Sequence, residues 1–228
     1  MFTATLFDYN GVLVDDEAVH LAAFRDVLSP LGVEVSEAEY VEKYLGYDDV
    51  GAFRAILRDR GRTTSDEDVA ALVDAKRPFY LERARGALRG FAGAAELVRR
   101  RASAGPVAIV SGALRHEIHL GLDVLGVRDL VRTVISAEDA RRSKPDPQGY
   151  LLGLEALSLS NAREQCVVIE DSLAGVESAR AASLACVAVG HSYPLDDLHA
   201  AGADLVVSNL DAITEETLSS LFERRARR

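Results

Sequence analysis

Six short apolar runs constrain the fold of this chain more than any other feature of its sequence. They span residues 3–7, 107–110, 133–135, 166–169, 185–189 and 205–207. Each run is nearly continuously hydrophobic rather than alternating, as in strands that are covered on both faces. Helical patterns separate most of the runs, at residues 94–102, 116–125, 148–157 and 173–182. Alternating strand and helix predict an α/β fold with a doubly wound parallel (Rossmann-like) sheet.

Residues 16–85 interrupt this alternation because they contain only helix-like segments, at 17–31, 37–44, 49–60 and 66–84. An all-helical domain inserted after the first strand is the simplest account. We therefore expect a sheet domain of residues 1–15 and 86–228, with residues 16–85 as the helical insert. Pro78 lies inside the last helical segment and is expected to kink or divide it.

Charge and hydropathy narrow the class of partner. The formal net charge of -10 repels nucleic acid and anionic membrane surfaces. No uninterrupted apolar segment approaches membrane-spanning length, and the first residues show no signal-peptide pattern. These features predict a cytoplasmic protein without nucleic-acid or membrane partners. Cys166 and Cys186 each lie in an apolar run and are expected to be buried, while the basic residues 223–228 are expected to form a solvated tail.

The first apolar run ends at a carboxylate, Asp8, which is followed by Asn10 and Gly11. In an open parallel sheet, ligands bind at the carboxyl ends of the strands. A carboxylate there, before a glycine that lets the chain turn, is placed to attack a group held above the sheet. A surface aspartate before a turn is the alternative.

Ser111, Gly112 and Ala113 follow the second run. A hydroxyl and free backbone amides at the start of a helix can hold phosphate oxygens. The alternative is an ordinary N-cap serine that only satisfies the helix itself.

Lysine and carboxylate residues follow the later runs. Lys144 precedes Pro145 and lies near Pro147, so its loop is stiff and its ammonium can be held beside negative charge. Glu170 and Asp171 close the fourth run, and adjacent carboxylates repel one another unless a cation compensates them. Oxygen ligands with few carboxylates suit Mg²⁺, which also binds substrate phosphate. A solvated acidic turn is the alternative.

The order of these four elements resembles the motif order of the haloacid dehalogenase superfamily, over essentially the whole chain. The helical insert looks like the cap domain of the β-phosphoglucomutase-like and phosphoglycolate-phosphatase-like branch. The resemblance implies a phosphoric monoester hydrolase in which Asp8 accepts the phosphoryl group and Lys144 offsets the charge. The implied Mg²⁺ ligands are Asp8, Asn10, Glu170 and Asp171. The implied substrate-binding residues are Gly11, His20, Lys76, Ser111, Gly112 and Ala113.

Asn10 departs from the pattern of this superfamily, whose phosphatases and mutases have aspartate there as the acid and base. A carboxamide cannot transfer the proton, and loss of positioned acid–base catalysis typically costs about 10² to 10⁴ in rate. Three interpretations remain open: an engineered change that traps a complex, natural divergence with slow or specialised chemistry, or a non-catalytic binding protein. Asp16 stands where relatives commonly have threonine or serine, which favours natural divergence, and one hypothesis is that Asp16 supplies the proton.

One residue of the insert matches a cap position of the resembled branch, and a second is a candidate for the cleft. His20 resembles a cap-hinge histidine, and a partly buried helix histidine is the alternative. Lys76 is a candidate for the cleft, although an exposed helix lysine is the more common case. Residues 45–49 lack the arginine with which β-phosphoglucomutase-like mutases bind a second phosphate, and their acidic side chains would repel it.

The leading hypothesis is a phosphatase for a small phosphorylated metabolite, whose cap closes over the site. A β-phosphoglucomutase-like mutase and a non-catalytic phosphate-ligand binder remain as alternatives. Metal-free haloacid dehalogenation is a further one, against which the pair Glu170 and Asp171 argues. A monomer or weak homodimer is expected.

Overall fold

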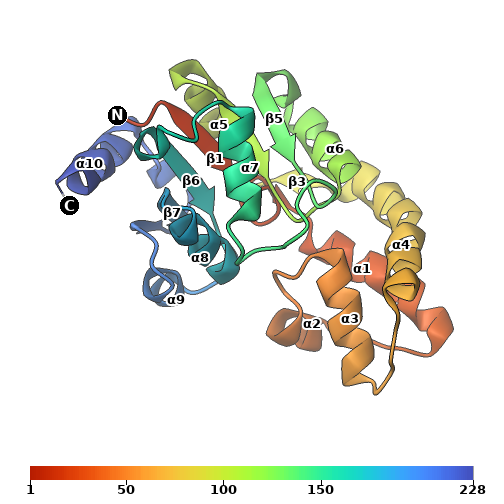
Figure 1. Ribbon diagram of the computed structural model, residues 1–228. Coiled ribbons are helices and arrows are strands. Elements are labelled where there is room, and N and C mark those ends of the chain that lie inside the picture. The colour runs from red at the N-terminus through yellow and green to blue at the C-terminus, as the bar shows by residue number, and fades with distance from the viewer. Residues whose placement is uncertain (228) are drawn as a thin grey trace. The chain divides into compact units, whose positions relative to one another are not determined.

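The computed structural model describes residues 1–227 and divides into two compact units. One unit combines Met1–Asp15 with Arg89–Arg228, and the other is Asp16–Leu88. Figure 1 shows the first as a sheet flanked by helices and the second as helices alone. Among the described residues, no helix is long and apolar enough to cross a membrane.

The first unit is built on a six-stranded parallel sheet with the order β5-β4-β1-β6-β7-β8. The strands are β1 (Ala4–Phe7), β4 (Val107–Val110), β5 (Val131–Ile135), β6 (Cys166–Glu170), β7 (Ala185–Val189) and β8 (Leu205–Val207). The parallel α/β sheet and the helical insert predicted from the apolar runs are therefore confirmed. Strand order changes direction at β1, so the carboxyl ends of β1 and its neighbours form the expected ligand edge.

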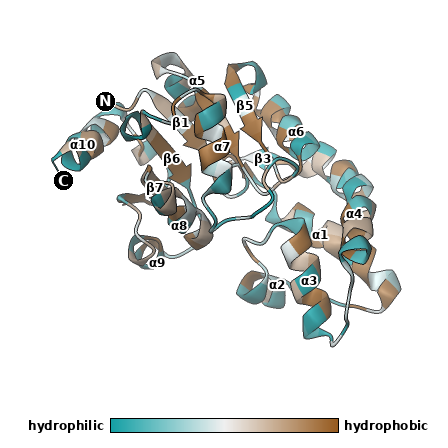
Figure 2. Ribbon diagram, in the orientation of Figure 1, coloured by the Kyte–Doolittle hydropathy of each residue, from teal (hydrophilic) through white to brown (hydrophobic). Residues whose placement is uncertain are grey.

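Helices cover both faces of this sheet. They are α5 (Ala94–Ala104), α6 (Arg115–Leu125), α7 (Gln148–Ala156), α8 (Leu173–Ala181), α9 (Leu195–Ala200) and α10 (Glu215–Ala226). Tyr150 of α7 and Val176 of α8 pack in one core with Leu6 and Val168, on one sheet face. Neighbouring strand residues point to opposite faces of the sheet. Thr5, which neighbours Leu6, accordingly contacts α5 on the opposite face. Burial on both faces explains why the strands are almost wholly apolar, as Figure 2 shows.

The basic C-terminal run is mostly exposed to solvent, as predicted, but it is helical rather than a loose tail. Its residues up to Ala226 belong to α10, whose N-terminus is capped by the Thr214 hydroxyl. Arg225 pairs with Asp204 at 2.7 Å, and Leu218 is buried. The last residue of the predicted tail, Arg228, lies outside the described residues. An amphipathic segment at a chain end cannot be told from a tail until its apolar side finds a partner.

Four helices make up the second unit: α1 (Glu17–Leu28), α2 (Glu37–Lys43), α3 (Asp49–Asp59) and α4 (Asp66–Ala87). Side chains from all four form one core around Phe24 and Phe53, whose rings lie 4.9 Å apart. The starts of α2, α3 and α4 are capped by the side chains of Ser36, Asp48 and Ser65. Because serine and aspartate are preferred at this position, the starts of these helices could be predicted from the sequence.

Pro78 does not divide α4, which runs through it without interruption. Lys76 before the proline and Tyr80 and Ala84 after it are all buried. Packing on both sides of the proline therefore offsets the missing backbone hydrogen bond. The helix ends at Ala87 rather than at residue 84.

A two-stranded antiparallel ribbon lies where the chain leaves and re-enters the first unit. It pairs β2 (Val14–Asp15) with β3 (Arg89–Gly90). The Phe91 amide also donates to the Leu13 carbonyl at 3.1 Å. Strands of two residues show no periodicity, so they were not predicted; only a return to the sheet domain near residue 88 was.

Candidate active site

Asp8 lies at the carboxyl end of β1, where the chain turns back on itself. Its amide donates to the Ile169 carbonyl at 2.9 Å, which extends the pairing of β1 with β6 up to the carboxylate. The turn is tight because the Leu13 amide donates to Tyr9 and the Gly11 amide to Val14. Gly11 has a φ of +73°, a conformation that disfavours side chains. The Asp8 carboxylate is thus held at the sheet edge, 7% exposed.

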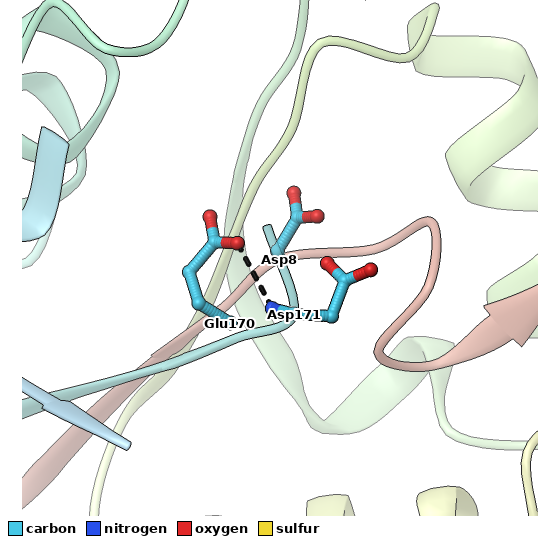
Figure 3. A group of neighbouring side chains, drawn as sticks. All are labelled: Asp8, Glu170 and Asp171. Carbon is cyan, nitrogen blue, oxygen red and sulfur yellow. Dashed lines mark hydrogen bonds between the residues drawn. The ribbon is translucent and has the colours of Figure 1, made fainter. Parts of the chain in front are cut away.

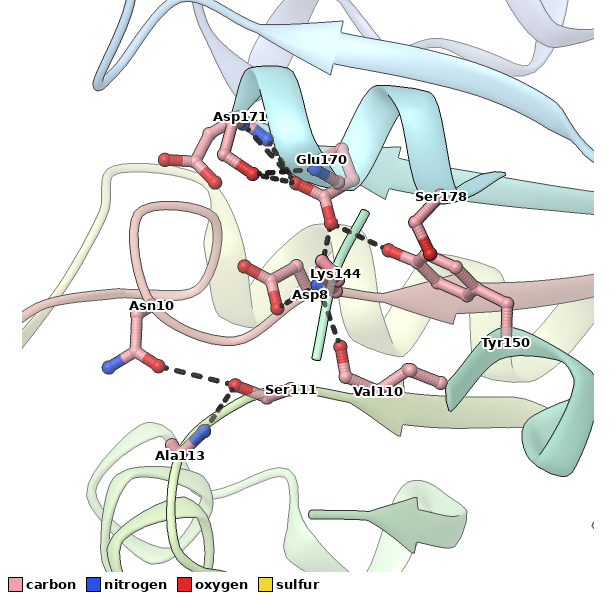
Figure 4. Close-up of polar contacts among 12 residues, drawn as sticks. Asp8, Asn10, Val110, Ser111, Ala113, Lys144, Tyr150, Glu170, Asp171 and Ser178 are labelled. Carbon is pink, nitrogen blue, oxygen red and sulfur yellow. Dashed lines mark hydrogen bonds and ion pairs between the residues drawn. The ribbon is translucent and has the colours of Figure 1, made fainter. Parts of the chain in front are cut away.

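Lys144 places its ammonium between two carboxylates (Figure 4). Its Nζ donates to Asp8 Oδ1 at 2.7 Å, to Glu170 Oε1 at 2.6 Å and to the Val110 carbonyl at 3.1 Å. An ammonium has three hydrogens, so all of them find acceptors. Burial lowers the pKa of Lys144, but the Asp8 and Glu170 carboxylates outweigh burial and raise that pKa above its ordinary value.

Glu170 is fully buried beneath the first turn of α8. Oε2 accepts from the amides of Asp171 and Ser172 and from the Ser172 hydroxyl, while Oε1 also accepts from the Tyr150 hydroxyl at 2.7 Å. Burial would raise the pKa of Glu170, yet the Lys144 ammonium and these donors hold it below the ordinary value. A Cβ on Gly175 would lie 1.9 Å from the Glu170 carboxyl, so only glycine leaves room for it.

The carboxylates of Asp8, Glu170 and Asp171 converge, with one ligand atom from each within 4.8 Å of the others. Figure 3 shows all three pointing the same way from the ends of β1 and β6. Burial raises the pKa of Asp8 to about 7, with Lys144 opposing and Glu170 adding to the rise. Burial and the charges of Glu170 and Asp8 raise the pKa of Asp171 well above its usual range. One ammonium does not balance three buried carboxylates, which is the electrostatic setting of a cation site.

The donor set fits Mg²⁺, since all of its atoms are carboxylate oxygens. Lys144 contacts one oxygen of Asp8, and Asp171 receives a hydrogen bond on Oδ2 alone, so each can turn its second oxygen toward a cation. Both oxygens of Glu170 already accept hydrogen bonds, which suits it to anchoring the lysine and the backbone. Asp8 and Asp171 are therefore better placed than Glu170 to contact a cation directly.

Ser111 lies at the end of β4, opposite Asn10. Its hydroxyl donates to Asn10 Oδ1 at 3.2 Å and accepts from the Ala113 amide at 3.1 Å. Helix α6 begins only at Arg115, with Leu114 as its N-cap residue. The alternative that Ser111 is a helix cap is therefore wrong. Its hydroxyl faces the carboxamide, and exposed Gly112 follows it.

The remaining predicted substrate residues, His20 and Lys76, lie in the helical unit and contact each other. Lys76 is fully buried, so the expectation of an exposed helix lysine was wrong. Its Nζ lies 2.7 Å from His20 Nδ1, is paired with Asp49, and sits 4.3 Å from the centre of the Phe24 ring. The ion pair and the aromatic ring together make burial of the ammonium tolerable.

Asp16 is fully buried in the same unit. Its Oδ2 accepts from the Tyr80 hydroxyl at 2.7 Å and lies 3.2 Å from His20 Nε2. The hypothesis that Asp16 donates a proton stays a prediction.

Four contributors to the candidate site were not recognised in the sequence. Tyr150 and Ser178 support it, because the Ser178 hydroxyl donates to the Asp146 carbonyl at 2.8 Å and so anchors the lysine loop. His191 and Ser192 follow β7. The signal for these two was present, since polar residues after an apolar run are what identified Asp8 and Ser111.

Comparison with known proteins identifies the family. Residues 2–183 match the model of the haloacid dehalogenase-like hydrolases. Protein CbbY of Rhodobacter capsulatus is 30% identical over 228 residues, covering 96% of this chain and 98% of that protein. Hexitol phosphatase B of Escherichia coli (strain K12) is 28% identical over 94% of this chain and 96% of that protein. Protein SUPPRESSOR OF QUENCHING 1 of Arabidopsis thaliana is 30% identical over 93% of this chain, which spans only 20% of that protein.

Solved structures of other proteins share the fold of this chain. A β-phosphoglucomutase from Clostridium difficile superposes with a TM-score of 0.87 over the full length of both chains at 21% identity, which is a likeness of fold. A variant of CbbY from Rhodobacter sphaeroides, in complex with xylulose-1,5-bisphosphate, reaches a TM-score of 0.80 at 25% identity, covering 92% of this chain and 95% of that one. This chain belongs to the haloacid dehalogenase-like hydrolase family.

Proposed function

We propose that this protein is a Mg²⁺-dependent phosphatase that hydrolyses a small phosphorylated metabolite through an aspartyl-phosphate on Asp8. One observation carries the proposal: the buried carboxylates of Asp8, Glu170 and Asp171 converge beside the Lys144 ammonium, at the carboxyl ends of β1 and β6. Such a site pairs a fixed nucleophile with charge that compensates a phosphoryl group, and phosphoryl transfer depends mainly on positioning and charge compensation.

In the proposed reaction, a carboxylate oxygen of Asp8 attacks the phosphorus, the bond between phosphorus and the alcohol oxygen breaks, and the leaving oxygen takes its proton from solvent water. Water then cleaves the acyl-phosphate and regenerates the carboxylate. Lys144 holds Asp8 in one orientation through Oδ1. The Gly112 amide and the Ser111 hydroxyl, once it turns away from Asn10, are the proposed donors to the phosphate oxygens. Bound Mg²⁺ would supply positive charge beside the phosphate, with Asp8, Asp171 and the Asn10 backbone as proposed ligands.

Asn10 sets the expected rate. The leaving oxygen needs a proton, and a carboxamide can donate a hydrogen bond but cannot transfer a proton. Asn10 Oδ1 accepts from Ser111, which leaves the NH₂ group of the amide to face another partner. We infer slow turnover for this chain, about 10² to 10⁴ below that of an Asn10→Asp variant.

The class of substrate is supported by relatives. Hexitol phosphatase B and the validoxylamine A 7'-phosphate phosphatase of Streptomyces hygroscopicus subsp. limoneus, 25% identical, both carry phosphatase names for polyhydroxylated compounds. A polyol or sugar monophosphate is therefore our proposed substrate class. We assign the helical unit as the cap. Its Lys76 ammonium is already paired with Asp49, so it is not available for a second phosphate, which favours hydrolysis over a mutase reaction.

A phosphatase screen tests this function. Sugar and polyol monophosphates are incubated with Mg²⁺ and the wild-type chain, with Asn10→Asp, or with the control Asp8→Asn, and released phosphate is measured. We expect slow hydrolysis by the wild type, faster hydrolysis by Asn10→Asp and none by Asp8→Asn. Absence of hydrolysis in both of the first two proteins would sink the proposal.

Phosphorus NMR of the same mixtures, with a sugar bisphosphate added as primer, separates the alternatives. Isomerised sugar phosphate without released phosphate would instead identify a mutase. Phosphate binding without turnover in either protein would identify a binding protein.

A further inference from the structure

The loop between β7 and α9, residues 190–194, closes one side of the candidate metal site. The Ser192 hydroxyl donates a hydrogen bond to Asp171 Oδ2. No other side chain among the described residues donates to the Asp171 carboxylate. Asp171 is 4% exposed, so this one hydroxyl decides how a buried carboxylate is turned.

The Ser192 hydroxyl does not cap the helix that follows it. A serine shortly before a helix usually caps it, but α9 has Pro194 as its N-cap residue and no side-chain cap. The hydroxyl instead crosses from the end of β7 to the end of β6, the neighbouring strand.

The loop that carries Ser192 is itself anchored. Nδ1 of His191 lies 2.8 Å from the Gly11 carbonyl oxygen; a carbonyl only accepts, so this nitrogen carries the proton. The imidazole also stacks on the Phe91 ring, with centroids 3.9 Å apart and planes 14° apart. His191 thus ties the Ser192 loop to the turn that follows Asp8.

Gly11 completes the arrangement. A Cβ on Gly11 would lie 1.9 Å from Asp171 Oδ2 and 2.9 Å from Ser192 Oγ. The Asp171 oxygen that accepts from Ser192 is therefore pressed against the Gly11 backbone. That oxygen is held on two sides, so the carboxylate has little freedom to rotate and its other oxygen, Oδ1, is the one left for a cation.

We propose that Ser192 is a positioning residue of the metal site, which fixes Asp171 through Oδ2 so that Oδ1 faces the cation. This inference rests on the proposed function only in taking Asp171 as a Mg²⁺ ligand. Partners that hold a metal ligand from behind typically contribute 10- to 100-fold in metal affinity, because an unheld ligand must be ordered on binding. Loss of the hydroxyl is expected to weaken Mg²⁺ binding by about that factor.

The test measures Mg²⁺ affinity by isothermal titration calorimetry on the full chain, without substrate. Ser192→Ala is compared with the wild type. The pair Ser192→Thr and Ser192→Val has the same shape and differs in the hydroxyl alone, so it keeps the test decisive if alanine disturbs the loop. Ser208→Ala is the matched control, because Ser208 follows the neighbouring strand β8 and is exposed.

We expect weaker Mg²⁺ binding by Ser192→Ala and Ser192→Val, affinity close to wild type for Ser192→Thr, and no change for Ser208→Ala. Melting temperatures without metal should be similar, while the Mg²⁺-induced increase shrinks in the alanine and valine variants. Equal affinity of the threonine and valine variants would overturn the role of Ser192 and leave the phosphatase proposal intact. A wild-type chain that binds no Mg²⁺ would overturn both.

Discussion

Lys144 Nζ lies 2.7 Å from Asp8 Oδ1, although 136 residues separate the two along the chain. The same ammonium contacts Glu170 Oε1 at 2.6 Å. Two buried carboxylates at the ends of neighbouring strands therefore share the Lys144 ammonium. The same lysine orients the proposed nucleophile, Asp8, and compensates its negative charge.

Replacing this lysine should disable the site. Lys144→Met removes the countercharge of Asp8 and Glu170, and loss of one preorganised electrostatic partner typically lowers turnover by about 10² to 10³. The change is measured as kcat on the best substrate from the phosphatase screen. Lys43→Met is the matched control, because Lys43 is half-exposed in the helical unit and pairs with Glu39 at 3.6 Å. Equal kcat for both variants would contradict the role assigned to Lys144.

Stabilisation by Mg²⁺ should depend on pH. The pKa of Asp8 is raised to about 7 and that of Asp171 is also raised, chiefly by burial. A raised carboxyl pKa means that the folded state binds the proton more tightly than the unfolded chain does. These groups therefore favour folding at low pH, and that contribution is lost as the pH rises from near 4 through about 7.

Mg²⁺ competes with those protons and compensates the ionised carboxylates. We expect a larger Mg²⁺-induced increase in melting temperature at about pH 8 than at about pH 5.5. Differential scanning fluorimetry with and without Mg²⁺ checks this, with Asp171→Asn as a control in which the difference shrinks. An increase that is as large at the lower pH would count against carboxylate ligands.

The buried pair of Lys76 and Asp49 should stabilise the helical unit. Lys76→Met leaves the Asp49 carboxylate, 13% exposed, without its cation, and breaking a buried pair on one side typically costs about 3–5 kcal/mol. The double variant Lys76→Met with Asp49→Leu should regain part of this loss. Urea unfolding measures each free energy, and Arg77→Met, on the exposed side of the same helix, serves as the control. A double variant as unstable as the sum of the single changes would show that the two do not interact.

Gly11 should tolerate no side chain. Gly11→Ala adds a Cβ 1.9 Å from Asp171 Oδ2, so it should displace that carboxylate and abolish Mg²⁺ binding. Gly32→Ala is the matched control, because Gly32 has a similar φ of +70° with no atom within 4 Å of the added Cβ. Backbone strain destabilises both variants by about 1–2 kcal/mol. Only Gly11→Ala should lose Mg²⁺ binding, as measured by calorimetry. Similar Mg²⁺ affinity of the two proteins would argue against the close contact of Gly11 with Asp171.

The fold and much of the candidate site could be predicted from the sequence, because both depend on local patterns. Continuous apolar runs identify strands covered on two faces, and the structure places β4, β7 and β8 at the predicted residues. Parallel strands bring their carboxyl ends to one edge, so residues that follow different runs, such as Asp8 and Asp171, were expected to meet. Their roles in catalysis and metal binding remain predictions.

Other features depended on partners distant in the chain. The burial of Lys76 and the uninterrupted helix through Pro78 both follow from packing that no local pattern encodes. Ser192 reads as an ordinary loop serine until β6 and β7 lie side by side and bring it to Asp171. The chain alone determined which residues are polar at strand ends; the tertiary structure decided which of them face one another, since burial and hydrogen-bond partners are properties of neighbours in space.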